Sequence, residues 1–144
     1  MKGLVWFRRD LRLRDNPALS AACQECQEIV PLFVFDEPLL HSHAFGSACV
    51  GFMRGCLEEL RRSLALHGVS LVWRMGDPVE SVMQAAEGFK VDAAYWNRDY
   101  EPAALERDRT VQQRLAQQGR TVRTFKDHVV FEAEEVRGQS GDPF

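Results

Sequence analysis

Short apolar runs alternate with helix-patterned segments along this 144-residue chain, and this alternation limits the fold more than any other feature. The runs are rich in β-branched and aromatic residues, and they occupy residues 4–7, 29–35, 70–73, 93–96 and 121–125. Near-continuous apolarity suits strands that are covered on both faces, as in a parallel sheet. We therefore predict an α/β fold in which helices connect five parallel strands.

Helix signals flank these runs and agree with one another. Pro17, Pro78 and Pro102 each stand where the first turn of a helix needs no backbone N–H, and an Asn or Asp before two of them can cap the helix. Gly68 and Gly119 fall where a helix end needs a left-handed residue. The sequence therefore predicts helices over residues 17–27, 47–67, 78–87 and 102–118.

Strand–helix–strand units of this length require right-handed crossovers, which build a doubly wound, Rossmann-like sheet. The simplest strand order is 3-2-1-4-5, with helices on both faces. We assign this α/β domain to residues 1–130. Residues 131–144 show no helical period and end in GQSGDPF, so we interpret them as the start of a linker to a further domain of a longer protein.

Polar side chains gather after several of the predicted strands. The loop after the first strand, residues 8–15, contains four arginines and two aspartates. In an open parallel sheet such loops meet at the carboxyl edge, where ligands bind. Carboxylates and arginines beside aromatic walls suit a flat, polar heterocycle, whereas the alternative is that the same charges pair with one another and cap helices. The side chains expected at this edge are Arg9, Asp10, Phe35, Asp36, Asp99, Tyr100 and Glu101.

Other kinds of site find little support in the sequence. It lacks the phosphate loops GxGxxG and GxxxxGK[ST], and it lacks a nucleophile elbow. His41 and His43 are two imidazoles in one loop, which is a weak signal for a metal centre. The net charge of −3 argues against an autonomous DNA-binding module, since such modules carry a basic face.

Three further expectations concern the core and the compartment. No run of 18 apolar residues occurs, so we expect no membrane span. The four cysteines do not form a disulfide framework, and we expect buried, reduced thiols in a cytoplasmic protein. The three tryptophans, Trp6, Trp73 and Trp96, lie in predicted strands and are expected in the core.

Several stretches of the chain form a recognisable series. The first and most specific is WFRRDLR at residues 6–12, which is followed by DN and AL within the next seven residues. The others are FVFD at 33–36, CLEEL at 56–60, LVW at 71–73, GDP at 76–78, YWNRDYEP at 95–102 and GDPF at 141–144. In this order, they resemble motifs of the DNA photolyase/cryptochrome family.

The resemblance implies a division of labour between two domains. This chain would be the N-terminal α/β domain of a deoxyribodipyrimidine photolyase-like flavoprotein, where it would bind an antenna chromophore: a deazaflavin, a flavin or methenyltetrahydrofolate. A C-terminal helical domain of the same protein would bind FAD and damaged DNA and would split cyclobutane pyrimidine dimers in light. The N-terminal domain alone would be a monomer without catalytic residues, without a membrane and without repair activity.

The resemblance also implies positions for the antenna. A deazaflavin or flavin would contact Arg9, Asp10, Phe35, Asp36 and Asp99. A folate antenna would lie near the domain boundary, beside Asn97 and Glu101. The chain has Cys49 where many relatives carry an arginine near the start of the long helix, which leaves one cation fewer at that rim.

Two alternative functions stay open at this point. A cryptochrome-type blue-light receptor would use the same fold for signalling, and the residues that separate it from a photolyase lie outside this chain. A free-standing nucleotide-binding module is the other alternative, although it predicts a phosphate loop that this sequence lacks.

Overall fold

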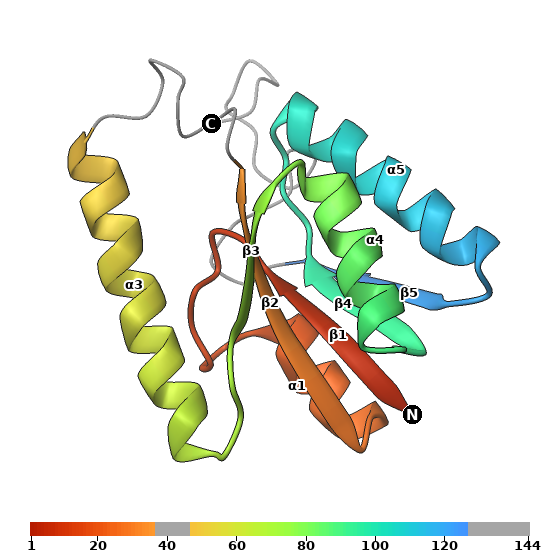
Figure 1. The fold of residues 1–144 in the computed structure, drawn as a ribbon, viewed down its shortest axis with the longest axis horizontal. Helices are drawn as coiled ribbons and strands as arrows, with labels where there is room; N and C mark the ends of the chain where they lie inside the picture. The colour runs from red at the N-terminus through yellow and green to blue at the C-terminus, as the bar shows by residue number, and fades with distance from the viewer. Residues whose placement is uncertain (37–46, 127–144) are drawn as a thin grey trace, which may run out of the picture.

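The computed structural model describes residues 1–36 and 47–126, which contain a five-stranded sheet. Neighbouring strands are parallel, and their order is β3-β2-β1-β4-β5 (Figure 1). This confirms the predicted fold class and strand order. The strands are β1 (Lys2–Phe7), β2 (Glu28–Asp36), β3 (Val72–Gly76), β4 (Ala93–Asn97) and β5 (Thr121–Phe125).

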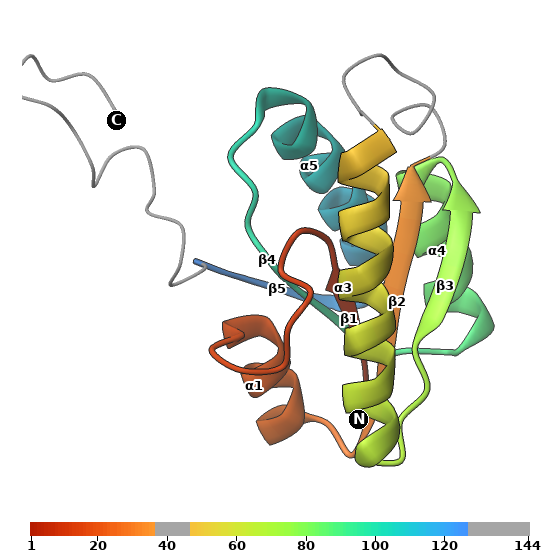
Figure 2. The same cartoon turned by 90° about the vertical axis from the view of Figure 1, so that its left-hand side faces the viewer.

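Helices cover both faces of the sheet, as the sequence predicts. They are α1 (Pro17–Glu25), α3 (Ser47–Leu66), α4 (Pro78–Gly88) and α5 (Pro102–Gln117). Figures 1 and 2 show α4 and α5 together on one side of the sheet and α1 and α3 on the other. The chain is thus three layers deep, and each face of the sheet has its own apolar core.

Successive side chains along each strand point to opposite faces of the sheet, so the apolar side chains are divided between these two cores. On β1, Leu4 and Trp6 face α4 and α5, while Val5 and Phe7 face α1 and α3. All four are at most 2% exposed. Burying a side chain of this size contributes about 1.5–3 kcal/mol, so both faces of the sheet stabilise the fold.

Helix ends follow the predicted chemistry. The Asn16 side chain accepts a hydrogen bond from the backbone N–H of Leu19 at 3.2 Å, and Asp77 accepts one from Glu80 at 3.2 Å. Helix α5 begins after Glu101 without a side-chain cap. The glycines that follow α3 and α5 have positive φ angles of 74° and 79°, which confirms their predicted left-handed conformation.

Some predictions about single residues were wrong. Trp73 was expected in the core but is 59% exposed, because β3 is an edge strand and its α3-facing side is incompletely covered. Cys23 was expected to be a buried thiol but is exposed. Helix α1 ends two residues earlier than predicted, at Glu25, and the third strand lies farther along the chain, at Val72–Gly76.

Some predictions lie outside the described residues. They include the loop with His41 and His43, the side chain of Cys49, and the proposed linker at 131–144 with the boundary at residue 130. Within the described ranges no helix is both long and apolar enough to cross a membrane. In the same part of the chain no three His, Cys, Asp or Glu side chains are placed to hold a metal ion.

Candidate functional site

A polar pocket lies where the carboxyl ends of β1 and β4 meet. These strands are neighbours in the sheet, and the strand order reverses between them. Crevices of this kind are the usual ligand sites of doubly wound sheets. We call this the β1–β4 pocket, and its volume is about 320 Å³. It is lined by Arg8, Arg9, Asp10, Asn97, Arg98, Asp99, Tyr100 and Glu101.

The inner wall of the pocket is tied together by the side chain of Asn97, which is 4% exposed. Its amide nitrogen donates to Asp10 Oδ2 at 2.5 Å and to Asn16 Oδ1 at 2.8 Å. Its amide oxygen accepts from the backbone N–H of Ala18 at 3.0 Å. One side chain thereby joins the end of β4 to the loop after β1 and to the start of α1.

Asp10 is the second member of this buried network and is 8% exposed. Its Oδ1 accepts from the backbone N–H of Arg8 at 2.9 Å, and its Oδ2 accepts from Asn97. The backbone carbonyl of Asp10 accepts from the Arg12 N–H at 2.7 Å. Both carboxylate oxygens are therefore engaged within the protein, which fits the structural role that the sequence left open for this residue.

Arg8 is held from three directions. Its guanidinium donates to Asp108 Oδ1 at 2.5 Å and to the backbone carbonyl of Asn97. The Arg8 side chain also lies over the ring of Trp6, with 4.9 Å between the guanidinium carbon and the ring centroid. The side chains of Arg8 and Asp108 are only 9% and 12% exposed. This pair fastens the first turns of α5 to the end of β1.

Sequence reasoning missed the role of Asp108. The residue lies on the face of α5 that carries Ala104, Val111 and Leu115, all of them buried. A carboxylate on an apolar helix face usually has a buried partner, because an unpaired charge there would be costly. The spacing of these four residues is visible in the sequence and could have pointed to a buried cation.

The outer wall of the pocket consists of charged side chains that stay in contact with solvent. Arg9 donates to Glu101 Oε1 at 2.7 Å, and its Nε lies 3.9 Å from Asp99 Oδ2. The Arg9 and Glu101 side chains are 70% and 60% exposed, while Asp99 is 19% exposed. Exposed ion pairs of this kind contribute about 1 kcal/mol or less, so a ligand can displace them at little cost.

The structure brings together most of the predicted site residues. Those that line the β1–β4 pocket are Arg9, Asp10, Asn97, Asp99, Tyr100 and Glu101. Phe35 lines a different hollow, between β2, β3 and α3. The backbone of Asp36 pairs with Gly76 at the end of β2, and its side chain lies outside the described residues.

Comparison with known proteins identifies the family. The DNA photolyase family model matches residues 3–144. The chain belongs to the DNA photolyase family. It is 34% identical over 141 residues to the deoxyribodipyrimidine photo-lyase of Synechococcus sp., an alignment that covers 98% of this chain and 29% of the relative. It is also 35% identical to cryptochrome-1 of Arabidopsis thaliana, covering 98% of this chain and 21% of that protein.

Solved photolyase structures have the same fold. A bacterial class III photolyase from Agrobacterium tumefaciens superposes with a TM-score of 0.85 at 31% identity, covering 99% of this chain and 29% of that one. An archaeal photolyase from Sulfolobus tokodaii, whose structure contains two FAD molecules, superposes with a TM-score of 0.83 at 32% identity. That alignment covers 96% of this chain and 32% of the archaeal one. The chain thus corresponds to the N-terminal α/β domain of the photolyase family and spans under a third of the length of these photolyases.

Proposed function

We propose that this chain binds an antenna chromophore in the β1–β4 pocket and is the light-harvesting domain of a longer deoxyribodipyrimidine photolyase-like flavoprotein. One observation carries the proposal: a polar pocket at the strand-order reversal of a sheet that belongs to the photolyase family. Sheets of this type bind ligands at that position.

The pocket residues fit a polar ring system. Arg9 would donate hydrogen bonds to ring carbonyl oxygens or to an anionic group, and Asp99 and Glu101 would accept them from N–H or O–H groups. Asp10 and Asn97 would not contact the ligand directly but would hold the pocket wall in place, because their polar atoms are already hydrogen-bonded within the protein. A volume of 320 Å³ is near the lower end of the ~300–1,000 Å³ of small-molecule sites, which favours one ring system over a whole dinucleotide.

An antenna chromophore, when bound, supplies absorption of light and transfer of the excitation energy. Our candidates are a deazaflavin, a flavin and methenyltetrahydrofolate, all of which present both donors and acceptors at a ring edge. The residues of this chain would orient that edge and limit its contact with water. No residue of this chain is assigned a catalytic role.

The repair chemistry would belong to the rest of the parent protein. We propose that a C-terminal FAD domain follows, that it contacts damaged DNA and that it repairs cyclobutane pyrimidine dimers in light. The net charge of −3 supports placing the DNA contacts outside this chain. The free thiols of Cys23, Cys26 and Cys56 suit a cytoplasmic protein, and we propose that the chain is a monomer.

Ligand titration tests the antenna site. Riboflavin, a 5-deazaflavin and methenyltetrahydrofolate are each titrated into the purified chain, and ligand fluorescence polarisation is followed. We expect saturable one-to-one binding of at least one ligand, weakened about tenfold by Arg9→Ala, because a charge-assisted hydrogen bond contributes about 1.5–3 kcal/mol. Arg14→Ala is the matched control, since Arg14 is an exposed arginine of the same loop outside the pocket lining.

Two results would contradict the proposal. The first is that the unaltered chain binds none of the three ligands, and the second is that Arg9→Ala and Arg14→Ala weaken binding equally. Either result would remove the β1–β4 pocket as the antenna site.

A cryptochrome-type light receptor is the second candidate function. It is favoured by the 35% identity to a plant cryptochrome, a value close to that of the photolyase relatives. Both functions use an antenna domain, so binding to this chain does not separate them. Dimer repair by the full-length parent under near-UV light does: repair supports the photolyase, and its absence in a folded, FAD-loaded parent supports the receptor.

A further inference from the structure

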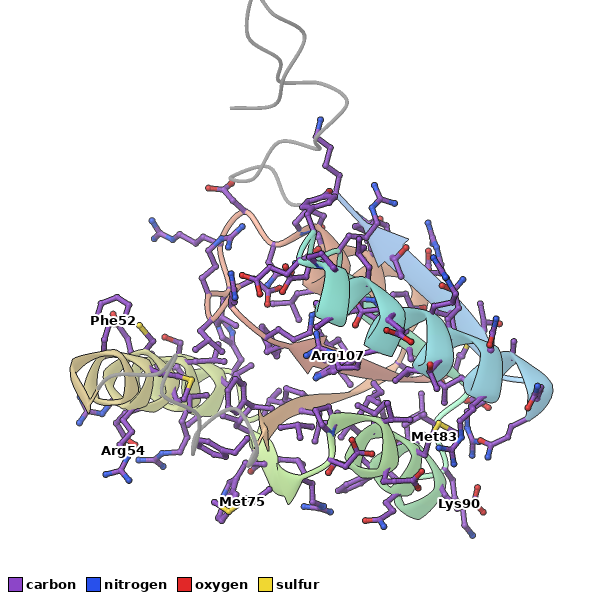
Figure 3. All side chains as sticks on the ribbon, turned by 90° about the horizontal axis from the view of Figure 1, so that it is seen from above. Phe52, Arg54, Met75, Met83, Lys90 and Arg107 are labelled. Atoms are coloured by element: carbon purple, nitrogen blue, oxygen red, sulfur yellow. The ribbon has the colours of Figure 1, made fainter. Side chains whose placement is uncertain are left out.

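Two cysteines stand three residues apart at the end of helix α1, and neither lines the β1–β4 pocket. Cys23 lies in the last turn of the helix and is exposed, while Cys26 follows the helix as its C-cap and is half-buried. Cys26 packs against the core beneath α1 and α3, on the opposite face of the sheet from Met83, which Figure 3 labels beside α4. The pair and the antenna proposal therefore stand on separate observations.

The backbone places the two cysteines at a distance that a disulfide can span. The backbone N–H of Cys26 donates to the carbonyl of Ala22 at 2.9 Å, so its Cα still follows the helix. Cα atoms three residues apart in a helix are about 5 Å apart, and disulfides join Cα atoms roughly 4.4–6.8 Å apart. The Cβ atoms start about 5–6 Å apart and must come within about 4.5 Å. Cys26 has φ of −117° and ψ of 145°, so the chain has left the helix there and can yield.

The two thiols also interact with each other. Partial burial of its sulfur, and then the nearby Cys26 thiol, raise the pKa of Cys23. The negative end of the helix dipole acts in the same direction, because it disfavours a thiolate in the last turn. A thiol with a raised pKa is a poor leaving group, so a disulfide at this position would resist reduction once it had formed.

The Cys26 sulfur is held against the sheet in the reduced chain. It lies 3.4 Å from the hydroxyl oxygen of Tyr95, which donates a hydrogen bond to Glu25 Oε2 at 2.6 Å. A Cβ on Gly3 would lie 2.6 Å from this sulfur, so the sulfur fills the space that the glycine leaves. Turning the sulfur outward to Cys23 would break the Tyr95 contact and empty that space. The redox state of the pair would therefore change how α1 packs on the sheet.

We propose that Cys23 and Cys26 form a reversible thiol–disulfide site that reacts with low-molecular-weight disulfides such as glutathione disulfide. The Cys23 thiol loses its proton and attacks one sulfur of the oxidant, which gives a mixed disulfide and releases one glutathione thiol with that proton. The Cys26 thiol then loses its proton and attacks the Cys23 sulfur, which releases the second glutathione thiol. Two protein thiols are oxidised and one disulfide is reduced. Disulfides of cytoplasmic proteins are usually transient and respond to redox conditions in this way.

A glutathione titration tests the site. The chain carries Cys49→Ser and Cys56→Ser, because Cys23 and Cys26 are then its only cysteines. It is equilibrated with mixtures of reduced and oxidised glutathione, quenched with acid and weighed by intact mass spectrometry. We expect a product that has lost two hydrogen atoms and carries no glutathione. Its ratio to the dithiol should fall with the square of the reduced glutathione concentration, because two glutathione thiols leave for each disulfide formed.

Three variants of this chain test the geometry. Cys26→Ala should accumulate glutathione on Cys23, with a first-power dependence on reduced glutathione. Cys26→Ala combined with Ser20→Cys keeps the three-residue spacing but moves it inside α1, where the backbone yields less, and it should form at least about tenfold less disulfide. Gly3→Ala should raise the ratio of disulfide to dithiol about fivefold, because its Cβ crowds the inward position of the Cys26 sulfur.

Three results would overturn the proposal. The first is a glutathione adduct as the main oxidised product of the chain that keeps both cysteines. The second is equal disulfide formation by the pair moved inside the helix. The third is a ratio of disulfide to dithiol that Gly3→Ala leaves unchanged in a chain that circular dichroism shows to be folded.

Discussion

Truncation of Asn97 should loosen the inner wall of the β1–β4 pocket and destabilise the whole fold. The side chain is 4% exposed and makes three hydrogen bonds, one of them to the carboxylate of Asp10. Asn97→Ala leaves Asp10 Oδ2 without its closest donor and leaves the Ala18 N–H without an acceptor. Asp10 Oδ2 then keeps only the longer hydrogen bond from the Asn16 side-chain amide at 3.4 Å.

The magnitude follows from those bonds. A hydrogen bond to a charged group contributes about 1.5–3 kcal/mol, and a neutral one contributes about 0.5–1.5 kcal/mol. Water can enter at the rim of the pocket and replace part of the lost hydrogen bonding. We therefore expect Asn97→Ala to lower the free energy of unfolding by about 3 kcal/mol. For a domain of this size each kcal/mol lowers Tm by about 3 °C, which predicts a loss of about 10 °C.

Urea unfolding followed by circular dichroism measures this change. Gln113→Ala is the matched control, because it removes an exposed side-chain amide from α5 and should change stability by less than about 0.5 kcal/mol. A double-mutant cycle that combines Asn97→Ala with Asp10→Ala then isolates the hydrogen bond between the two side chains, and we expect a coupling energy of about 1.5 kcal/mol or more. Additive losses, or a loss as small as that of the control, would refute the role given to Asn97.

Other parts of the chain give further predictions. Gly3→Ala should lower the free energy of unfolding, measured in urea, by about 1–3 kcal/mol, because the new Cβ would lie 2.6 Å from Cys26 Sγ and 3.0 Å from the Tyr95 ring. Adding Cys26→Ala to the same chain should restore most of the lost stability. Burial of the Tyr95 hydroxyl raises the pKa of Tyr95, and the neighbouring Cys26 raises it further. The folded state therefore favours the neutral hydroxyl. This contribution to the free energy of unfolding is fully present below about pH 10, the usual pKa of tyrosine, and it falls as the pH rises further. The stability difference between the unaltered chain and Tyr95→Phe, measured from about pH 9 to 11, should therefore shrink, and a constant difference would contradict this. The chain alone, with FAD added, should repair no pyrimidine dimers under near-UV light in a chromatographic assay; repair would contradict the division of labour.

Local chemistry explains why the sequence predicted so much of the fold. The prolines at the helix starts and the glycines at the helix ends act within a few residues, so their structural meaning is readable without tertiary information. Trp73 shows where this reasoning ends. Its run of apolar residues predicts a strand, but its burial depends on whether that strand is central or at the edge, and on how far α3 extends over it.

The candidate site was predictable to the extent that it depends on backbone position. The ends of β1 and β4 had to meet at one edge, so Arg9, Asp99 and Glu101 were expected together and do line one pocket. The division into an inner and an outer layer was not predictable, because it depends on side-chain directions. Asp10 and Asp99 are the same residue type at similar strand ends, yet one is 8% exposed and bonded inward while the other forms part of the solvent-exposed wall.

The placement of Phe35 could have been predicted from the strand order alone. In the order 3-2-1-4-5 the chain leaves β1 toward β2 on one side and reaches β4 on the other, so the crevice opens between β1 and β4. The end of β2 lies one strand away from that crevice. Alternation along β2 puts Phe33 and Phe35 on the face of α1 and α3, where their rings lie 5.0 Å apart. Phe35 therefore continues an apolar face toward β3 and Trp73, and the same topology that built the polar pocket directs this ring to the hollow between β2, β3 and α3.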